Sequence, residues 1–350
     1  MTRLAVRLFL VAAVAGVSAD AAPPTPVVRL AGLPETLVVG QRWVARLTVR
    51  PPARPILRAT SGARRVSVQA RSTGRVRYSA TLRLPTPGIW RLSAFVRRRS
   101  FPLGRVRVIA SYPLALPAQI LASDDRSLLV VERQGRDRIL RVDPATGRFS
   151  VVTTRIPSPW GLARDANGRV IVSGGSGIYE LGGTKIADVA AGPIAAAANG
   201  NLYLAEQTRV GRIGRGGGVE TLSTAVAAPH GLVLRRDGSL VVSDSGNGRL
   251  LRIDPATRET AVVASGLKSP LGAIEAADGH LLVVEYDSGR LLRIGDGRVV
   301  AQSLRKPYAL TQSADGSIYV VESGDDGRPS GGIARVADDG SVVRLRLVPT

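Results

Sequence analysis

The stretch PHGLVLRRDGSLVVSDSGNGRLLRID, residues 229 to 254, decides the fold of this chain. Short apolar runs alternate in it with turns rich in Gly and Asp, a pattern that predicts three consecutive β-strands. The β-forming segment from 259 to 265 then supplies a fourth strand. Four short antiparallel strands within about 40 residues make a sheet too small to bury both of its own faces.

Similar units recur from residue 111 to residue 350. A Pro-x-(Gly or Ala)-apolar element begins the units at residues 159, 229, 270 and 307, and weaker copies, PAQI and PIAA, begin those at 117 and 193. Packing such sheets in a ring buries their faces against one another, and the copies predict a six-bladed β-propeller. An open solenoid is the structural alternative, but its end units would expose apolar faces.

Residues 22 to 110 are predicted to form a separate domain of an all-β chain. From residue 75 to 84, Val76, Tyr78 and Ala80 share one face of an extended chain, while Arg75 and Arg77 share the other. This period is that of a half-buried strand. Pro-rich breaks separate several such runs, which predicts a β-sandwich. The segment LPTPGIW, residues 84 to 90, resembles bacterial immunoglobulin-like modules, so we expect an Ig-like β-sandwich.

The charge of the chain is concentrated in this first domain. Residues 24 to 110 hold 18 Arg, no Lys and a single acid, Glu35, whereas residues 111 to 350 hold 28 basic and 25 acidic residues. One interpretation is a solvated outer face; the other is a surface that contacts an anionic envelope polymer. Aromatic residues are sparse among the arginines, which disfavours a platform for stacking nucleic-acid bases.

The first 21 residues have the pattern of a secretory signal peptide. Arg3 and Arg7 precede the apolar run 8 to 17, and Ala19 and Ala21 form a small-residue cleavage site. We expect a secreted or periplasmic, monomeric protein without a transmembrane span in the mature chain; an uncleaved anchor is the alternative. The absence of Cys excludes disulfides, thiolate metal sites and cysteine nucleophiles.

A candidate ligand site follows from the repeat. The first two strands of each unit run antiparallel, so the Pro-x-Gly element and the acid that ends the second strand should share one rim of the propeller. A small molecule or a protein partner is expected at that mouth. Its candidate ligand-binding residues are Trp160, His230 and Tyr308 from the x position, and Glu132, Glu206, Asp244, Glu285 and Glu322 from the strand ends.

The acids also have a structural interpretation. Arg138, Arg209, Arg249 and Arg290 follow their acids by three to six residues, so acid–Arg pairs could simply hold the loop after each second strand.

His230 is the candidate catalytic residue, with Asp244 as its partner. A neutral imidazole near a carboxylate can act as a general base or as a metal ligand. Asp244 and Glu285 are the candidate ligands of a divalent ion, calcium or magnesium. His280 lies in a DGH turn and is expected at the surface.

Residues 113 to 350 resemble the NHL-like six-bladed propeller superfamily, which includes streptogramin lyases and gluconolactonase-like proteins. The resemblance is strongest at 229 to 254, where a Pro-His element is followed by a strand-ending acid. It implies the fold and, as one hypothesis, a metal-assisted lyase or lactone hydrolase. Ala228 and "SPLG" at 269 to 272 stand where these enzymes carry acids. The first hypothesis is therefore a non-catalytic ligand- or partner-binding protein.

Overall fold

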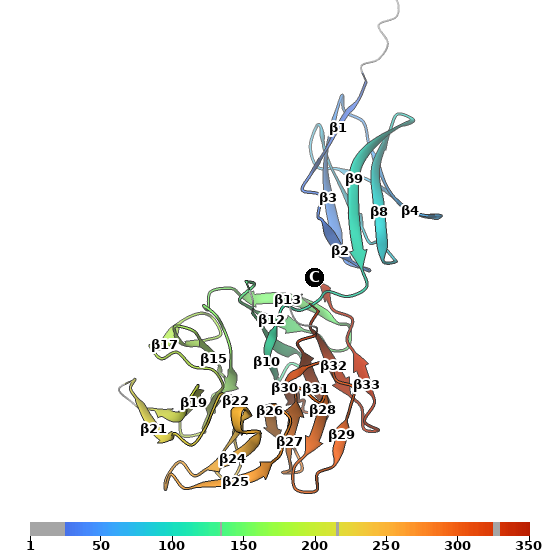
Figure 1. Cartoon of the computed structure of the whole chain (residues 1–350). Coiled ribbons are helices and arrows are strands. Elements are labelled where there is room, and N and C mark those ends of the chain that lie inside the picture. The colour runs from blue at the N-terminus through green and yellow to red at the C-terminus, as the bar shows by residue number, and fades with distance from the viewer. Residues whose placement is uncertain (1–24, 134, 215–216, 325–329) are drawn as a thin grey trace, which may run out of the picture. The chain divides into compact units, whose positions relative to one another are not determined.

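The computed structural model describes residues 25–133, 135–214, 217–324 and 330–350, and the regular secondary structure of these residues is β-strand except for one short 3-10 turn (Figure 1). The predicted signal peptide, residues 1 to 21, lies outside the described residues. Among the residues described, no helix is long and apolar enough to cross a membrane. Contacts divide the chain into two compact units, one ending at Arg107 and the other formed mainly by residues 108 to 350. The short segments 36–42 and 83–88 group with the second unit.

The N-terminal part contains a four-stranded and a five-stranded sheet. The four-stranded sheet has the order β1-β3-β7-β6. Its strands are β1 (Val27–Ala31), β3 (Trp43–Arg50), β7 (Arg77–Leu82) and β6 (Arg71–Ser72). The five-stranded sheet has the order β2-β9-β8-β4-β5. Its strands are β2 (Thr36–Val38), β9 (Arg99–Ile109), β8 (Gly88–Val96), β4 (Ile56–Ser61) and β5 (Arg64–Gln69).

The alternation predicted around residue 78 is confirmed. Tyr78, Ala80 and Leu82 of β7 are buried, whereas Arg77 is exposed. On β8, Trp90 is fully buried. Each strand therefore gives its apolar side chains to a core and its arginines to the surface.

The second unit begins with a sheet that contains both early and late strands. It consists of β10 (Pro117–Ala122), β11 (Leu128–Glu132), β12 (Arg138–Val142), β13 (Arg148–Thr153) and β34 (Val348–Pro349). The second sheet consists of β14 (Leu162–Arg164), β15 (Val170–Gly174), β16 (Gly177–Glu180) and β17 (Lys185–Ala187). The third consists of β18 (Ile194–Ala196), β19 (Leu202–Glu206), β20 (Arg209–Ile213) and β21 (Val219–Ser223).

Three further sheets repeat the same order. The fourth consists of β22 (Pro229–Leu234), β23 (Leu240–Asp244), β24 (Arg249–Ile253) and β25 (Thr260–Ser265), with a 3-10 turn, η1 (Ser245–Asn247), after β23. The fifth consists of β26 (Pro270–Glu275), β27 (Leu281–Glu285), β28 (Arg290–Arg293) and β29 (Val299–Ala301). The sixth consists of β30 (Pro307–Gln312), β31 (Ile318–Glu322), β32 (Gly332–Val336) and β33 (Val342–Arg344).

These sheets pack face to face around a ring. Each of six apolar clusters takes its residues from two successive sheets, and the last of them joins the sixth sheet to the first. Representative pairs are Val131 with Val172, Ile171 with Leu204, Tyr203 with Val242, Val241 with Val283, Val284 with Val320, and Val321 with Val130. The arrangement is that of a β-propeller rather than an open solenoid (Figure 1).

The recurrent Pro-x-Gly element suits the crowded centre of this ring. A Cβ atom added to Gly231 would lie 2.4 Å from the carbonyl oxygen of Leu271 on the next sheet. One added to Gly161 would lie 2.8 Å from the carbonyl oxygen of Gly192. Glycine therefore allows the innermost strands to approach closely.

Candidate functional site

The start of each first strand and the end of each second strand lie at one rim, as the sequence predicts. The registered pairs are Pro117 with Glu132, Pro229 with Asp244, Pro270 with Glu285, and Pro307 with Glu322. Pro-x-Gly elements and strand-ending acids are therefore cross-strand neighbours. We call this edge of the propeller the mouth rim.

The acids at the mouth rim bind backbone amides in a repeated geometry. In four sheets the carboxylate accepts a hydrogen bond from the N–H of the residue two positions before the proline. These bonds run from Ala115 to Glu132 (2.7 Å), from Ala227 to Asp244 (2.7 Å), from Lys268 to Glu285 (2.8 Å) and from Arg305 to Glu322 (2.8 Å). Each bond holds the loop that leads into a first strand, and satisfies a donor that would otherwise be costly to bury.

Each of these acids is also paired with an arginine. The four pairs predicted from spacing are present: Arg138 with Glu132 (2.6 Å), Arg249 with Asp244 (2.7 Å), Arg290 with Glu285 (2.7 Å), and Arg209 with Glu206. Glu322 pairs instead with Arg344 (2.8 Å) on the fourth strand of its sheet. The carboxylates other than Glu206 are almost fully buried. These contacts match the structural interpretation of the acids.

The donor atoms of Asp244 and Glu285 do not fit a calcium or magnesium ion. Oδ2 of Asp244 accepts hydrogen bonds from Asn247 (2.9 Å) and Arg249 (2.7 Å), while Oδ1 is held by Ala227. A guanidinium at this distance occupies the position of a cation and repels another. Over the described ranges, no group of three or more His, Asp or Glu side chains is arranged to hold a metal ion.

The surroundings of Glu285 shift the pKa of its carboxyl. Burial acts to raise the pKa of its carboxyl, but hydrogen bonds from the Ser288 hydroxyl, the Lys268 amide and Arg290 outweigh it and lower the pKa. The carboxyl is therefore held in its charged form by its partners.

The x residues of three alternate sheets meet at the mouth. Trp160, His230 and Tyr308 belong to the second, fourth and sixth sheets, and each is partly exposed. The His230 ring centroid lies 6.1 Å from that of Trp160 and 6.0 Å from that of Tyr308, the latter edge to face. Such separations are those of interacting aromatic rings. Ala118, Ile194 and Leu271, the x residues of the other sheets, are buried.

The ring orientation of His230 is fixed by the backbone. Its Nδ1 lies 2.9 Å from the carbonyl oxygen of Ala228. A carbonyl oxygen can only accept, so Nδ1 is the donor in this contact, and Nε2 is the acceptor nitrogen of the corresponding neutral tautomer. The predicted partner, Asp244, accepts its hydrogen bonds from Ala227, Asn247 and Arg249. Among the described contacts, the backbone carbonyl orients the imidazole and the carboxylate does not.

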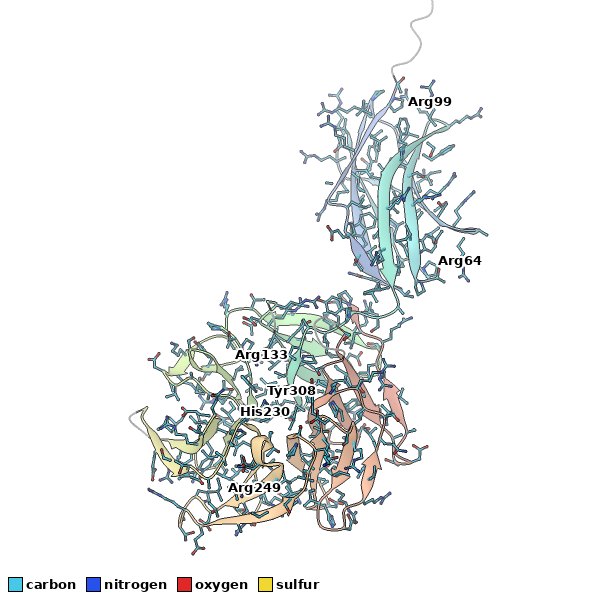
Figure 2. All side chains as sticks on the ribbon, in the orientation of Figure 1. Arg64, Arg99, Arg133, His230, Arg249 and Tyr308 are labelled. Carbon is cyan, nitrogen blue, oxygen red and sulfur yellow. The ribbon has the colours of Figure 1, made fainter. Side chains whose placement is uncertain are left out.

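Two residues of the mouth were not predicted from the sequence. The Arg133 guanidinium lies over the Trp160 ring, with Cζ 4.1 Å from its centroid, and the Tyr286 ring lies edge to face with Tyr308 at 6.5 Å. Figure 2 shows Arg133, Tyr308 and His230 together, apart from Arg249. Both missed residues directly follow a strand-ending acid. Since neighbouring residues of an extended chain point to opposite sides, that position was the available signal.

Tyr308 lies in a partly enclosed environment. Burial raises the pKa of its hydroxyl, against an opposing effect of the Arg133 charge. We call Trp160, His230, Tyr308 and Arg133 the mouth cluster. It combines apolar rings, one basic imidazole nitrogen and one guanidinium.

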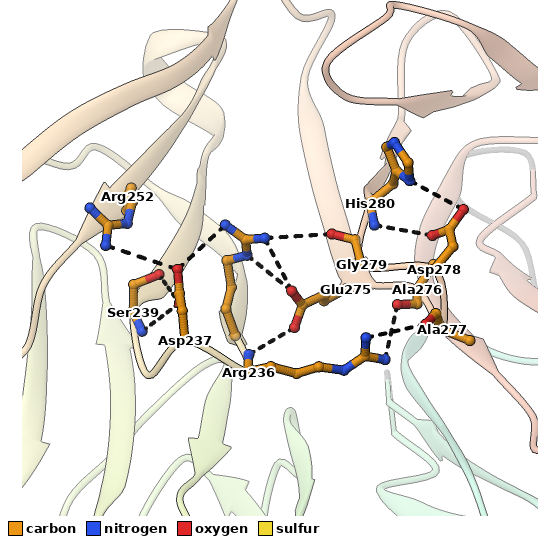
Figure 3. Close-up of polar contacts among 11 residues, drawn as sticks. Arg236, Asp237, Ser239, Arg252, Glu275, Ala276, Ala277, Asp278, Gly279 and His280 are labelled. Atoms are coloured by element: carbon orange, nitrogen blue, oxygen red, sulfur yellow. Dashed lines mark hydrogen bonds and ion pairs between the residues drawn. The ribbon is translucent and has the colours of Figure 1, made fainter.

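His280, the other histidine, lies on a different part of the propeller. It belongs to the turn between β26 and β27, at the ends of those strands opposite Pro270 and Glu285. Its ring is exposed and Nδ1 lies 3.2 Å from Asp278, as Figure 3 shows. Nearby, Glu275 accepts hydrogen bonds from Arg235 and from the amide of Arg236, which links the fourth and fifth sheets. The surface position predicted for His280 is confirmed.

Comparisons with known proteins agree on the fold. No protein-family model and no curated protein matches the sequence. Among solved structures, a streptogramin B lyase is similar with a TM-score of 0.51 and 18% identity, over 68% of this chain and 86% of that one. A putative gluconolactonase is similar with a TM-score of 0.52 and 15% identity, over 66% of this chain and 91% of that one.

A third similar structure is a calcium-binding protein, regucalcin, from Agrobacterium tumefaciens. Its TM-score is 0.52 at 18% identity, over 68% of this chain and 94% of that one. At such identities the likeness concerns the fold alone. The chain carries a β-propeller of the kind found in streptogramin lyase, gluconolactonase and regucalcin structures.

Proposed function

We propose that the mouth cluster is the active site of a lyase or hydrolase in which His230 is the general base. The observation that carries this proposal is the contact of Nδ1 with the carbonyl of Ala228, which makes Nε2 the acceptor nitrogen of the neutral tautomer in a side chain that is partly exposed among aromatic rings. An imidazole oriented in this way can remove a proton from a substrate or from water. The named activities of the similar propellers agree with this class of chemistry.

The other mouth residues have distinct roles in this proposal. Trp160 and Tyr308 offer apolar ring faces for the body of a substrate. Arg133, for which no ion pair is found in the described part of the chain, is available to a carbonyl or carboxylate oxygen on which charge develops. Asp244 and Glu322 hold the loops that lead to His230 and Tyr308. No step passes through a divalent ion, because the carboxylate oxygens of Asp244 and Glu285 are already engaged.

The test is turnover of cyclic esters. The full chain is incubated with a panel of aryl-substituted lactones and cyclic depsipeptides, and ring opening is followed by mass spectrometry. We expect His230→Ala to lose at least about a hundredfold in rate, the scale of general-base catalysis. His280→Ala is the matched control and should retain the full rate. Equal rates for the two variants, or no ring opening by the unmodified chain, would exclude the proposal.

A second candidate function is ligand binding without turnover. It is favoured by the indole N–H of Trp160, which is buried and has no hydrogen-bond partner among the described residues. A ligand oxygen or a water molecule could accept from it. Quenching of tryptophan fluorescence by the same compounds, retained in His230→Ala without product formation by either protein, would support this candidate over the enzyme.

We propose further that the six sheets are six NHL-like blades and that the N-terminal sheets form an Ig-like sandwich. The clusters between successive sheets and the alternating burial of β7 support these assignments. Export of the chain as a secreted or periplasmic monomer is likewise a proposal, supported by the sequence pattern of residues 1 to 21. Detection of a mature N-terminus near residue 22 in the extracellular fraction would test it.

A further inference from the structure

The four-stranded N-terminal sheet presents a cross of arginines on its exposed face. Thr48 on β3 pairs with Arg29 of β1 on one side and with Arg77 of β7 on the other. Arg46 and Arg50 lie two residues before and after Thr48 on the same strand. Cross-strand partners and alternate residues share a face, so four guanidinium groups surround one hydroxyl. We call these residues the arginine cross.

The spacing of the arginine cross is set by sheet geometry. Neighbouring strands lie about 4.8 Å apart, and two residues along a strand span about 6.7 Å. Diagonal neighbours such as Arg46 and Arg77 are therefore about 7–8 Å apart at their Cβ atoms. All four arginines are exposed, and Arg71 of β6 extends the row that contains Arg46 through Ser79.

No acid balances this charge. Glu35 is the only acid between residues 24 and 110. None of the ion pairs found among the described residues involves an arginine of the cross; all of them lie between residues 124 and 344. Like charges at this spacing repel one another unless an external anion lies between them. The arginine cross therefore carries positive charge that no acidic side chain among the described residues neutralises.

The chemistry of the face selects a linear phosphate-bearing polymer. Guanidinium groups bind phosphate oxygens through paired hydrogen bonds, and a polymer places a phosphate near each of several arginines at once. The aromatic side chains needed to stack bases are missing from this face, because Tyr78 points into the core. The apolar side chains exposed on it are Val27 and Val44, at 56% and 39%, which is little for insertion into a lipid surface.

We propose that the arginine cross is a docking site for a phosphate-bearing polyanion. This site is separate from the mouth cluster, whose residues all follow position 130. It assigns to the N-terminal sheets the role of holding the chain on an anionic polymer while the propeller mouth carries out its own chemistry.

The experiment measures binding of long-chain inorganic polyphosphate to the full chain at increasing NaCl concentration. The test variant is Arg46→Ser/Arg50→Ser/Arg77→Ser. The matched control is Arg64→Ser/Arg65→Ser/Arg91→Ser, which removes the same charge from exposed positions of the five-stranded sheet. Circular dichroism confirms that each variant is folded.

We expect the cross variant to lose at least about tenfold in affinity at low salt, and the slope of log K against log salt to fall by about two to three. The control variant should keep most of the affinity and most of the salt dependence of the unmodified chain. Equal losses in the two variants would overturn the proposal, because attraction would then follow total charge. Binding that ignores salt would overturn it too. So would binding to vesicles of an anionic phospholipid but not to polyphosphate, since the surface would then be a membrane contact.

Discussion

Arginine has opposite surroundings in the two regions of this protein. In the propeller, Arg138, Arg209, Arg249 and Arg290 each stand across the ladder from a strand-ending acid and pair with it. In the four-stranded N-terminal sheet, arginines that are more exposed stand across from Thr48, Ser79 or Val27. Arginine therefore forms ion pairs that hold loops in the propeller, whereas in the N-terminal sheet its charge has no acidic partner among the described residues. The cross-strand partner of the arginine decides which of the two occurs.

Two propeller sheets lack an arginine across from the end of their second strand, and they show that the acid–arginine pairs are structural. In the second sheet the acid is replaced by Gly174, and the residue across from it is Gly177, so acid and arginine are lost together. In the sixth sheet Glu322 faces Gly332, and Arg344 reaches it from β33. A ligand-binding acid would have no reason to follow its arginine in this way.

The largest effect should come from breaking one propeller pair. Asp244→Ala leaves the amide of Ala227 without its acceptor and Arg249 without its counter-charge. We expect a loss of about 3 kcal/mol or more in the free energy of unfolding, measured by urea denaturation, because removing one member of a buried pair strands the other. The matched control is Asp296→Ala, whose pair with Arg293 is more exposed and should contribute little to stability. Equal losses would mean that the rim pairs are no stronger than surface pairs.

A smaller effect should appear with pH, and only in the propeller. The pKa of Glu285 is lowered from its ordinary value of 4.5. A lowered carboxyl pKa stabilises the folded state above about 4.5, and this contribution is lost as pH falls through the folded-state value. Hydrogen exchange should therefore show β27 amides losing protection on acidification while β3 amides do not. Glu285→Gln should remove part of that pH dependence. An equal loss of amide protection in β27 and β3 on acidification would contradict the expected difference between the propeller and the N-terminal sheets.

Salt should produce the smallest effect, with the opposite sign in the two regions. The arginines of the cross repel over about 7–8 Å, and added salt screens charges beyond about one Debye length. We expect the N-terminal sheets to gain up to about 1 kcal/mol between low and high salt, and exposed propeller pairs to weaken slightly. Protection of β3 and β7 amides, compared with β23, gives the measurement. If added salt leaves the protection of the β3 amides unchanged, the arginines of the cross do not repel one another measurably.

Much of this architecture was predictable from the sequence. The period of two fixes the faces of β7, and the Pro-x-Gly spacing locates the first strand of each propeller sheet. The acid–Arg pairs also followed from short spacing along the chain. Arg344 was missed because the equivalent third-strand position holds Gly332, so its partnership depends on reach across a sheet rather than on sequence distance.

The mouth was predictable only in outline. That Trp160, His230 and Tyr308 share one rim follows from strand direction, but their mutual contact depends on how three separate sheets tilt about a common axis. The bond from His230 to the carbonyl of Ala228 depends on the local backbone, since Ala228 has a left-handed φ of 46°. Leu116, Ser158, Ser269 and Lys306 precede their prolines with similar positive φ values. Sequence patterns carry little information on this conformation.

The short strand β34 has a consequence for how the molecule is made. It runs parallel to β13, with Val348 beside Arg148 and Pro349 beside Phe149. During translation β10 to β13 emerge from the ribosome long before β34 exists, so the outer edge of β13 stays open until β34 has been synthesised. Contacts between such distant parts of a chain form slowly. We therefore expect the outer edge of β13 to be one of the last parts of the first sheet to be covered during folding.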